Sequence, residues 1–163
     1  MKRASLAALL GLFAVAAGAH PAPNSMLRLD FQAQAVLAEY WVPESELAYA
    51  RAVDPGGEFP AYLLRHLAAE TRDGKPWRVT VGAVREAQYL DHPYRVAVLR
   101  FAPPAGAPTK DFVLIDDAIT HEVRNHVVFV SARRGQGFEL LGALQYPAHR
   151  LPVAAPAAVA QSR

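Results

Sequence analysis

The sequence predicts a mainly β fold, an immunoglobulin-like two-sheet sandwich of about seven short strands with one short helical insertion. Two observations lead to this prediction. Alternating apolar and polar residues recur in short runs, which is the periodicity of strands with one solvent-facing side. Turns rich in Gly, Pro and Asp separate these runs, and 163 residues are enough to bury one core. A small barrel is the alternative that the same pattern allows.

The first segment, residues 1–19, is expected to be a removed export signal. It opens with a lysine and an arginine and continues as an apolar run of about a dozen residues, shorter than a membrane-spanning helix. Ala17 and Ala19 form the A-x-A pattern that signal peptidase reads. Cleavage there would place the mature chain in the periplasm, with His20 as its first residue and no transmembrane helix.

Seven later runs have strand character. They span residues 26–32, 35–42, 77–84, 94–101, 111–117, 126–133 and 138–146. The first run, MLRLDFQ, alternates cleanly, and the second is expected to pair with it as a hairpin. The fourth, YRVAVLRF, is apolar on both faces and predicts a central strand. The residues expected in the core are Phe31, Trp77, Val79, Val98, Leu114, Val128 and Phe129.

Helical character is confined to the stretch between the second and third of these runs. PESELAYA (43–50) predicts a short helical turn that starts at a proline. DPGGEFP (54–60) has the composition of a loop, and AYLLRHLAAE (61–70) predicts a helix with its leucines on one side. The β-sandwich domain is expected over residues 20–146, followed by a flexible tail rich in Ala and Pro over 147–163.

Composition argues against several classes of function. The formal net charge of +2 includes one lysine and one arginine of the export signal, and without them 15 of the 17 basic residues remain, against 15 acidic ones. A basic surface for nucleic acid is therefore not predicted. The absence of cysteine excludes disulfides and Cys-based zinc sites. No serine lies in a nucleophile elbow and no phosphate-binding loop is present, so we expect no enzyme and assign no catalytic residue.

The segment IDDAITHEVRNH concentrates side chains that can bind a metal. Asp116, His121 and His126 are the candidate ligands, because imidazole and carboxylate together suit zinc, copper or nickel. A mature N-terminal His20 would add its α-amino nitrogen and ring Nδ1, and the metal would then be nickel or copper. The alternative interpretation is a polar connection between two strands with solvated charges. His66, on the helical segment, is interpreted as a surface or structural residue.

The order of whole segments carries a family resemblance. PNSMLRLDF, VLAEYWVPESELAYA, YLLRHL, DGKPWRV, HPYRVAVLRFAPP and DFVLIDDAITHEVRNHVVFVSAR follow one another in the chain. Together they resemble the N-terminal extracytoplasmic region of HupE/UreJ-type bacterial membrane proteins, over roughly residues 20–146. The resemblance implies a periplasmic location and a link to metal uptake, because members of that family have been linked to nickel supply for hydrogenase and urease. In the family this region precedes a polytopic membrane domain that the present sequence lacks, so no transport residue is carried over.

Two functional hypotheses follow. In the first, the protein is a non-enzymatic periplasmic domain that accompanies a metal-transport membrane protein and acts by binding a membrane-protein partner. The chain is then either a free-standing relative of the family or a truncated reading frame. In the second, it is a stand-alone periplasmic metal-binding protein of the copper type that uses the mature N-terminal His20.

Overall fold

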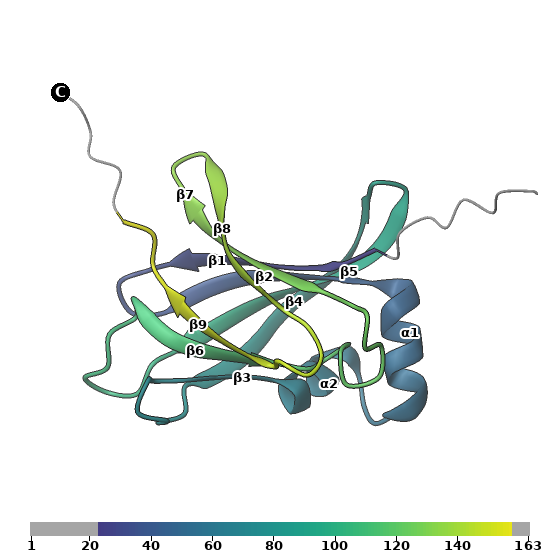
Figure 1. Ribbon diagram of the computed structural model, residues 1–163, viewed down its shortest axis with the longest axis horizontal. Coiled ribbons are helices and arrows are strands. Elements are labelled where there is room, and N and C mark those ends of the chain that lie inside the picture. Colours follow the sequence, from purple (N-terminus) through teal and green to yellow (C-terminus); the bar gives the residue numbers. More distant parts are fainter. Residues whose placement is uncertain (1–22, 158–163) are drawn as a thin grey trace, which may run out of the picture.

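The computed structural model describes residues 23–157 of the chain (Figure 1). The expected export signal and His20 lie outside the described residues. Within the described range, nine strands form two sheets, and two helices lie between the second and third strands. The predicted mainly β, two-sheet architecture is confirmed. The two helices correspond to the helical turn predicted over 43–50 and the helix predicted over 61–70, and the described range has two strands more than expected.

The larger sheet has six strands. They are β1 (Ser25–Phe31), β2 (Val36–Pro43), β4 (Arg78–Tyr89), β5 (His92–Ala102), β7 (Val128–Arg134) and β8 (Gly137–Leu144). Their order across the sheet is β4-β5-β2-β1-β7-β8, and every neighbouring pair is antiparallel except β1 and β7, which are parallel. The hairpin predicted for the first two strands is confirmed, with Phe31 opposite Val36 at its closed end.

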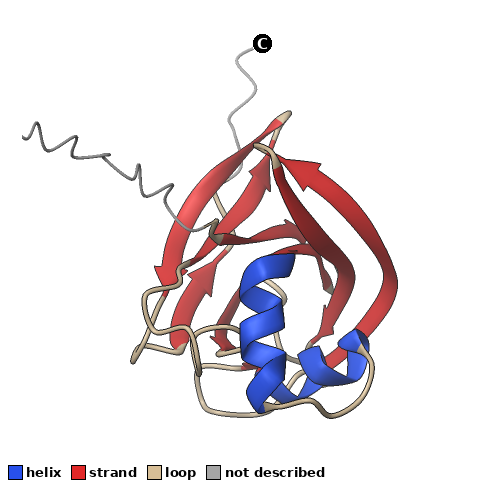
Figure 2. Ribbon diagram, turned by 90° about the vertical axis from the view of Figure 1, so that its right-hand side faces the viewer, coloured by secondary structure: helices blue, strands red, loops and turns tan. Residues whose placement is uncertain are grey.

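The smaller sheet consists of β3 (Leu67–Glu70), β6 (Asp111–Asp116) and β9 (Arg150–Ala154), in the order β3-β6-β9. It lies below the larger sheet in Figure 1. The helices α1 (Glu44–Val53) and α2 (Phe59–His66) lie together at one end of the sandwich and face the viewer in Figure 2. None of the described elements covers the opposite face of the larger sheet (Figure 1).

The ends of the helices follow from local sequence and from strand pairing. Pro43 precedes α1 in an extended conformation, and acidic residues in the first turn of this helix suit the positive end of the helix dipole. The helix predicted over 61–70 ends earlier than expected, at His66. The next residue, Leu67, pairs with Asp116 of β6, so tertiary pairing overrides the helical propensity of the last four residues. No helix among residues 23–157 is long and apolar enough to cross a membrane.

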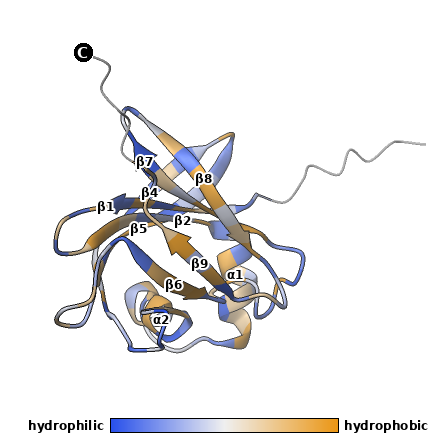
Figure 3. Ribbon diagram, turned by 60° about the vertical axis from the view of Figure 1, so that its left-hand side comes forward, coloured by the Kyte–Doolittle hydropathy of each residue, from blue (hydrophilic) through white to orange (hydrophobic). Residues whose placement is uncertain are grey.

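The inward-facing residues of both sheets and both helices form one core. Leu27 and Leu29 of β1 are fully buried there. Phe112 of β6 lies between Trp77 and Phe101, with ring centroids 4.7 and 6.3 Å away, and such contacts between aromatic rings stabilise a core beyond the area they bury. The colouring of Figure 3 shows that β9 and part of β6 contribute apolar segments to this layer.

Burial confirms some of the expected core residues and corrects others. Three of them are at most 5 % exposed: Trp77, Leu114 and Val128. Two are partly buried and pack against the core: Phe31 and Val79. Val98 and Phe129 are each 39 % exposed, so their expected burial was wrong. The register places Val98 opposite Glu39, on the face of the sheet that points away from the core, and side chains of successive residues in a strand alternate between the two faces.

The tail expected to be flexible over 147–163 forms strand β9 in its first half, so that prediction was wrong for residues 150–154. Val153 is fully buried in the core. Leu151 packs so closely over Gly142 of β8 that a Cβ atom there would lie 2.8 Å from its Cδ1. Strand β9 is an edge strand, the place in a sheet where a proline such as Pro152 is tolerated.

Candidate functional site

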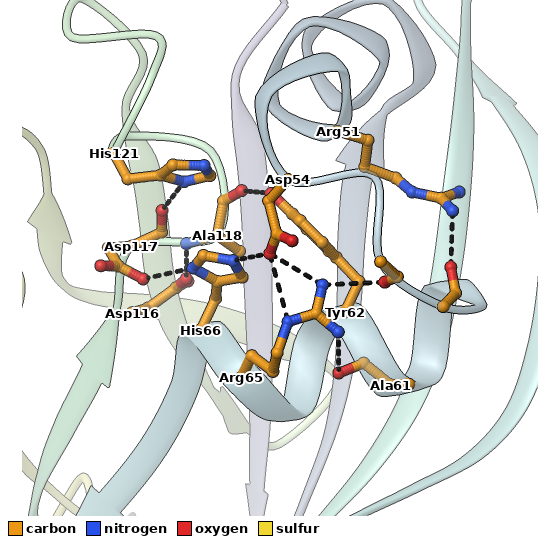
Figure 4. A network of polar contacts seen from close by, with 12 residues as sticks. Arg51, Asp54, Ala61, Tyr62, Arg65, His66, Asp116, Asp117, Ala118 and His121 are labelled. Atoms are coloured by element: carbon orange, nitrogen blue, oxygen red, sulfur yellow. Dashed lines mark hydrogen bonds and ion pairs between the residues drawn. The ribbon is translucent and has the colours of Figure 1, made fainter.

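A polar cluster centred on His66 joins three segments at the helical end of the sandwich (Figure 4). The ring Nδ1 of His66 lies 2.9 Å from Oδ1 of Asp117, which directly follows β6. Its Nε2 lies 3.0 Å from Oδ2 of Asp54, which directly follows α1. Each of these carboxylate oxygens can accept a hydrogen bond from a ring N–H of His66. Both ring nitrogens of His66 thus lie within hydrogen-bonding distance of a carboxylate oxygen.

Arg65 shares the carboxylate of Asp54 with His66. Its Nη2 and Nε lie 2.7 and 3.2 Å from Oδ2 of Asp54. Hydrogen bonds from Arg65, and then from His66, lower the pKa of Asp54 to about 2. Asp54 is therefore a fixed negative charge at neutral pH.

Two aromatic side chains enclose the ring of His66. The ring of His121 stacks on it, with centroids 4.5 Å apart and planes inclined by 16°. The ring of Tyr62 lies 4.6 Å away, and its hydroxyl donates a hydrogen bond to the carbonyl of Ala118. His121 donates from Nδ1 to the carbonyl of Asp117 at 2.8 Å, and its buried Nε2 has no hydrogen-bond partner within residues 23–157. Among the predicted ligands, Oδ2 of Asp116 and Nδ1 of His126 are likewise buried and without a hydrogen-bond partner within residues 23–157.

Asp116, the second predicted ligand, is fully buried at the end of β6. Its Oδ1 accepts a hydrogen bond from the backbone N–H of Ala118 at 2.9 Å. Burial raises the pKa of Asp116 to about 6, against the lowering effect of the neighbouring Tyr40 hydroxyl. The hydroxyl of Tyr40 is itself fully buried, and burial followed by the charge of Asp116 raises its pKa. This pair lies within the core and faces away from solvent.

His126, the third predicted ligand, is 2 % exposed and lies just before β7. Its Nε2 accepts hydrogen bonds from the backbone N–H of Ser25 at 3.2 Å and from the Ser25 hydroxyl at 2.9 Å. Burial lowers the pKa of His126 to about 4, so the ring is neutral at pH 7. Its contacts attach the start of β1 to β7, which is a structural role.

The structure thus holds three of the four predicted metal ligands by separate partners. Asp116 contacts Ala118, His121 contacts the carbonyl of Asp117, and His126 contacts Ser25. Within residues 23–157, no three side chains of the metal-ligating types are grouped so that they could hold a metal ion. The fourth candidate, His20, lies outside the described residues, so binding through the N-terminal histidine stays a prediction.

The cluster around His66 was not found from the sequence. Asp54 stood in a segment interpreted as a loop, and His66 was assigned only a surface or structural role. The partners of His66 lie 12 and 51 positions away in the chain. No local pattern connects residues at such separations, and only the packing of α2 against the end of β6 brings them together.

A second candidate site is the face of the larger sheet that points away from the smaller sheet, here called the outer face. Three cross-strand rows of side chains form it. The first row contains Arg85, Val96, Trp41, Met26, Phe129 and Ala143, of which Val96 is fully buried beneath its neighbours. The second row contains Val98, Glu39, Arg28, Ser131 and Leu140. The third row contains Arg100, Leu37, Asp30, Arg133 and Phe138.

Arginine and aromatic side chains alternate across the outer face. The guanidinium carbon of Arg28 lies 5.0 Å from the ring centroid of Trp41 and 5.5 Å from that of Phe138. The guanidinium carbon of Arg85 also lies 5.0 Å from the ring centroid of Trp41, and that of Arg133 lies 5.1 Å from the ring centroid of Phe138. A cation over an aromatic face is attracted by the ring quadrupole, so these contacts hold the arginine side chains flat along the sheet.

Large apolar side chains of the outer face remain exposed. They are Leu37, Val98, Phe129, Phe138 and Leu140, with exposed fractions of 41, 39, 39, 44 and 63 %. The face is also hollowed by a pocket of about 200 Å³. Its lining includes the apolar side chains Leu37, Val98 and Phe138 and the charged side chains Arg28, Arg133, Asp30 and Glu39. Charged side chains lie between these apolar ones, and exposed apolar surface with polar groups around it is typical of interaction sites.

Comparison with known proteins adds no assignment. No protein-family model matches the chain, and no curated protein shows significant similarity to it.

Proposed function

We propose that the protein is a non-enzymatic periplasmic domain that binds a membrane-protein partner through the outer face, as an accessory of metal uptake. The observation that supports binding is the set of exposed apolar side chains, spread over three rows of a sheet face that none of the described elements covers. The link with metal uptake, and with nickel in particular, rests on the resemblance to the HupE/UreJ ectodomain.

The polar cluster around His66 supports the same proposal, because its contacts suit a structural role. Both ring nitrogens of His66 contact carboxylates. The group Asp54–His66–Asp117, here called the clamp, joins α2 to the segments that follow α1 and β6. Such a clamp keeps the helical end of the sandwich rigid and leaves the outer face, formed by other strands, as the surface for a partner.

The test uses nickel uptake by cells that lack the protein and receive it back as a variant. Val98→Asp and Leu140→Asp introduce a charge at exposed positions of the outer face, where the fold should tolerate it. Leu64→Asp is the matched control, since Leu64 is 47 % exposed on α2, away from this face. We expect the wild type and the control to restore uptake, and the two outer-face variants to fail although they are exported and folded.

Contact with the partner is tested in the same cells with a photo-crosslinking amino acid at Val98, and at Leu64 as control. Crosslinks from Val98 to a single membrane protein, without crosslinks from Leu64, are the expected result. Normal nickel uptake in cells without the protein would contradict the accessory role. Equal crosslinking from both positions would contradict binding through the outer face.

A further inference from the structure

We propose that the partner segment bound at the outer face is an acidic and apolar segment, whose carboxylates pair with Arg28 and Arg100 while one apolar side chain fills the pocket between Leu37, Val98 and Phe138. This inference rests on the proposed function and specifies the chemistry of the partner.

The charges of the outer face carry the first part of the argument. Its three rows contain four arginines against two carboxylates. Both carboxylates already have a partner: Arg85 lies 3.1 Å from Glu39, and Arg133 lies 3.5 Å from Asp30. Within residues 23–157, Arg28 and Arg100 take part in no ion pair. The outer face therefore carries a net positive charge, and a partner with complementary charge would be negative.

The geometry of Arg28 makes it suited to a carboxylate. Its guanidinium carbon lies 5.0 Å from the ring centroid of Trp41 and 5.5 Å from that of Phe138. An arginine held flat in this way has lost side-chain freedom before binding, and its planar N–H groups match a carboxylate. Arg28 occupies the central row of the face, between Glu39 and Ser131 in the strand register.

The pocket supplies the apolar part. Its volume of about 200 Å³ suits a single large side chain. Its apolar walls include Leu37, Val98 and Phe138, all of them at least 39 % exposed, and the charged residues Arg28, Arg133, Asp30 and Glu39 also line it. Burying a leucine or phenylalanine side chain typically stabilises a complex by about 1.5–3 kcal/mol. A central apolar anchor with charge pairs around it is the usual arrangement of a protein–protein contact.

Other occupants fit the face less well. A second copy of the chain in a face-to-face dimer would bring two positive surpluses together, which opposes association. An anionic lipid surface would meet the carboxylates Asp30 and Glu39 among the arginines. A protein segment can place its carboxylates at the two unpaired arginines and its apolar side chain at the pocket, so it accommodates both features.

The experiment measures binding of synthetic peptides by tryptophan fluorescence. The chain has two tryptophans, and Trp41 lies on the outer face while Trp77 is 5 % exposed in the core. The probe is a short peptide composed of glutamate and leucine, compared with the same peptide in which every glutamate is replaced by glutamine or by lysine. We expect the glutamate peptide alone to change the fluorescence, and Trp41→Phe to abolish the response.

Variants then test the two arginines. Arg28→Gln and Arg100→Gln should each weaken binding of the glutamate peptide about tenfold, the usual loss when one charged hydrogen-bond partner is removed. Arg72→Gln is the matched control, because Arg72 pairs with Asp111 of β6, away from the outer face. Unchanged melting temperatures would show that the variants fold.

The outcomes separate this inference from the proposed function. Equal binding of the glutamate and glutamine peptides, absence of any binding, or equal loss in the Arg72→Gln control would overturn the acidic partner. Crosslinking from Val98 in cells would then still support a partner of different chemistry at the same face. Concentration-dependent dimers, or binding to phosphatidylglycerol vesicles that Arg28→Gln weakens, would overturn the inference in favour of a second copy or of a lipid surface.

Discussion

The imidazole rings of His66 and His121 lie nearly parallel, with centroids 4.5 Å apart and planes inclined by 16°. His66 ends α2, and His121 belongs to the connection between β6 and β7, so this stack joins two segments that are remote in the chain. The carboxylates of Asp54 and Asp117 contact the two ring nitrogens of His66, at 3.0 and 2.9 Å.

Replacement of His66 tests the clamp. His66→Ala removes both carboxylate contacts and the stack on His121, and we expect it to lower the free energy of unfolding by about 1–3 kcal/mol. Urea denaturation of the purified protein measures this loss. Arg72→Gln, which breaks a half-exposed pair with Asp111, should change stability by less than about 1 kcal/mol. Equal effects of the two substitutions would show that the clamp contributes nothing specific.

His126 should make the protein sensitive to acid. Its pKa is about 4 in the folded protein and 6.5 in the unfolded chain, so the unfolded state binds the extra proton between these values. Stability therefore falls as the pH drops from about 6.5 to 4. His126→Gln lacks this titration, and the stability difference between wild type and variant should shrink by up to roughly 3 kcal/mol over that range. A difference independent of pH would mean that His126 is not buried in its neutral form.

Asp116 should make the protein less stable as the pH rises, which is the opposite of the effect of His126, over almost the same pH range. Its pKa is about 6 in the folded protein against 3.8 unfolded, so the folded state holds the extra proton between these values. Its contribution to stability is full below pH 4 and is lost as the pH rises through about 6. Denaturation series at several pH values should show wild type losing stability relative to Asp116→Asn as the pH rises from about 4 to 6. A constant difference would contradict the burial of an ionisable carboxyl group here.

The pairing of β9 is tested at Val153. This side chain is fully buried, and Val153→Ala should cost about 2 kcal/mol through lost apolar burial and the space left behind. Ala154→Ser, at the neighbouring exposed position, is the matched control and should be nearly neutral. Thermal unfolding of both variants decides the matter. If Val153→Ala has the same melting temperature as the wild type, residues 150–154 do not belong to the stable core.

Metal binding by the mature N-terminus remains a prediction from the sequence. Protein that begins at His20 should bind copper or nickel through the α-amino group and the ring of this residue, and calorimetry with each metal measures it. A variant with one additional residue before His20 should lose this affinity, because the amine is then displaced from the ring. His121→Ala shows whether the ring with the free Nε2 takes part. Equal binding by the extended variant would refute the N-terminal chelate.

Local alternation of apolar and polar residues was enough to determine the β character of this protein. The β1–β2 hairpin and the strands around Leu114 and Val128 followed from it, because a period of two is a property of each strand alone. The same pattern does not state which face will be covered. Val98 and Phe129 were therefore assigned to the core, although the described part of the chain leaves their side of the sheet open.

Only the tertiary structure decided the contacts between remote segments. The Asp54–His66–Asp117 clamp depends on where α2 ends, and α2 ends where Leu67 finds a partner in β6. Strand β9 likewise forms because β6 offers a free edge and the core has room for Val153, whereas its own Ala- and Pro-rich sequence predicts a tail. The physical reason is the same in each case: the free energy of these contacts comes from a partner far away in the chain, which no local pattern identifies.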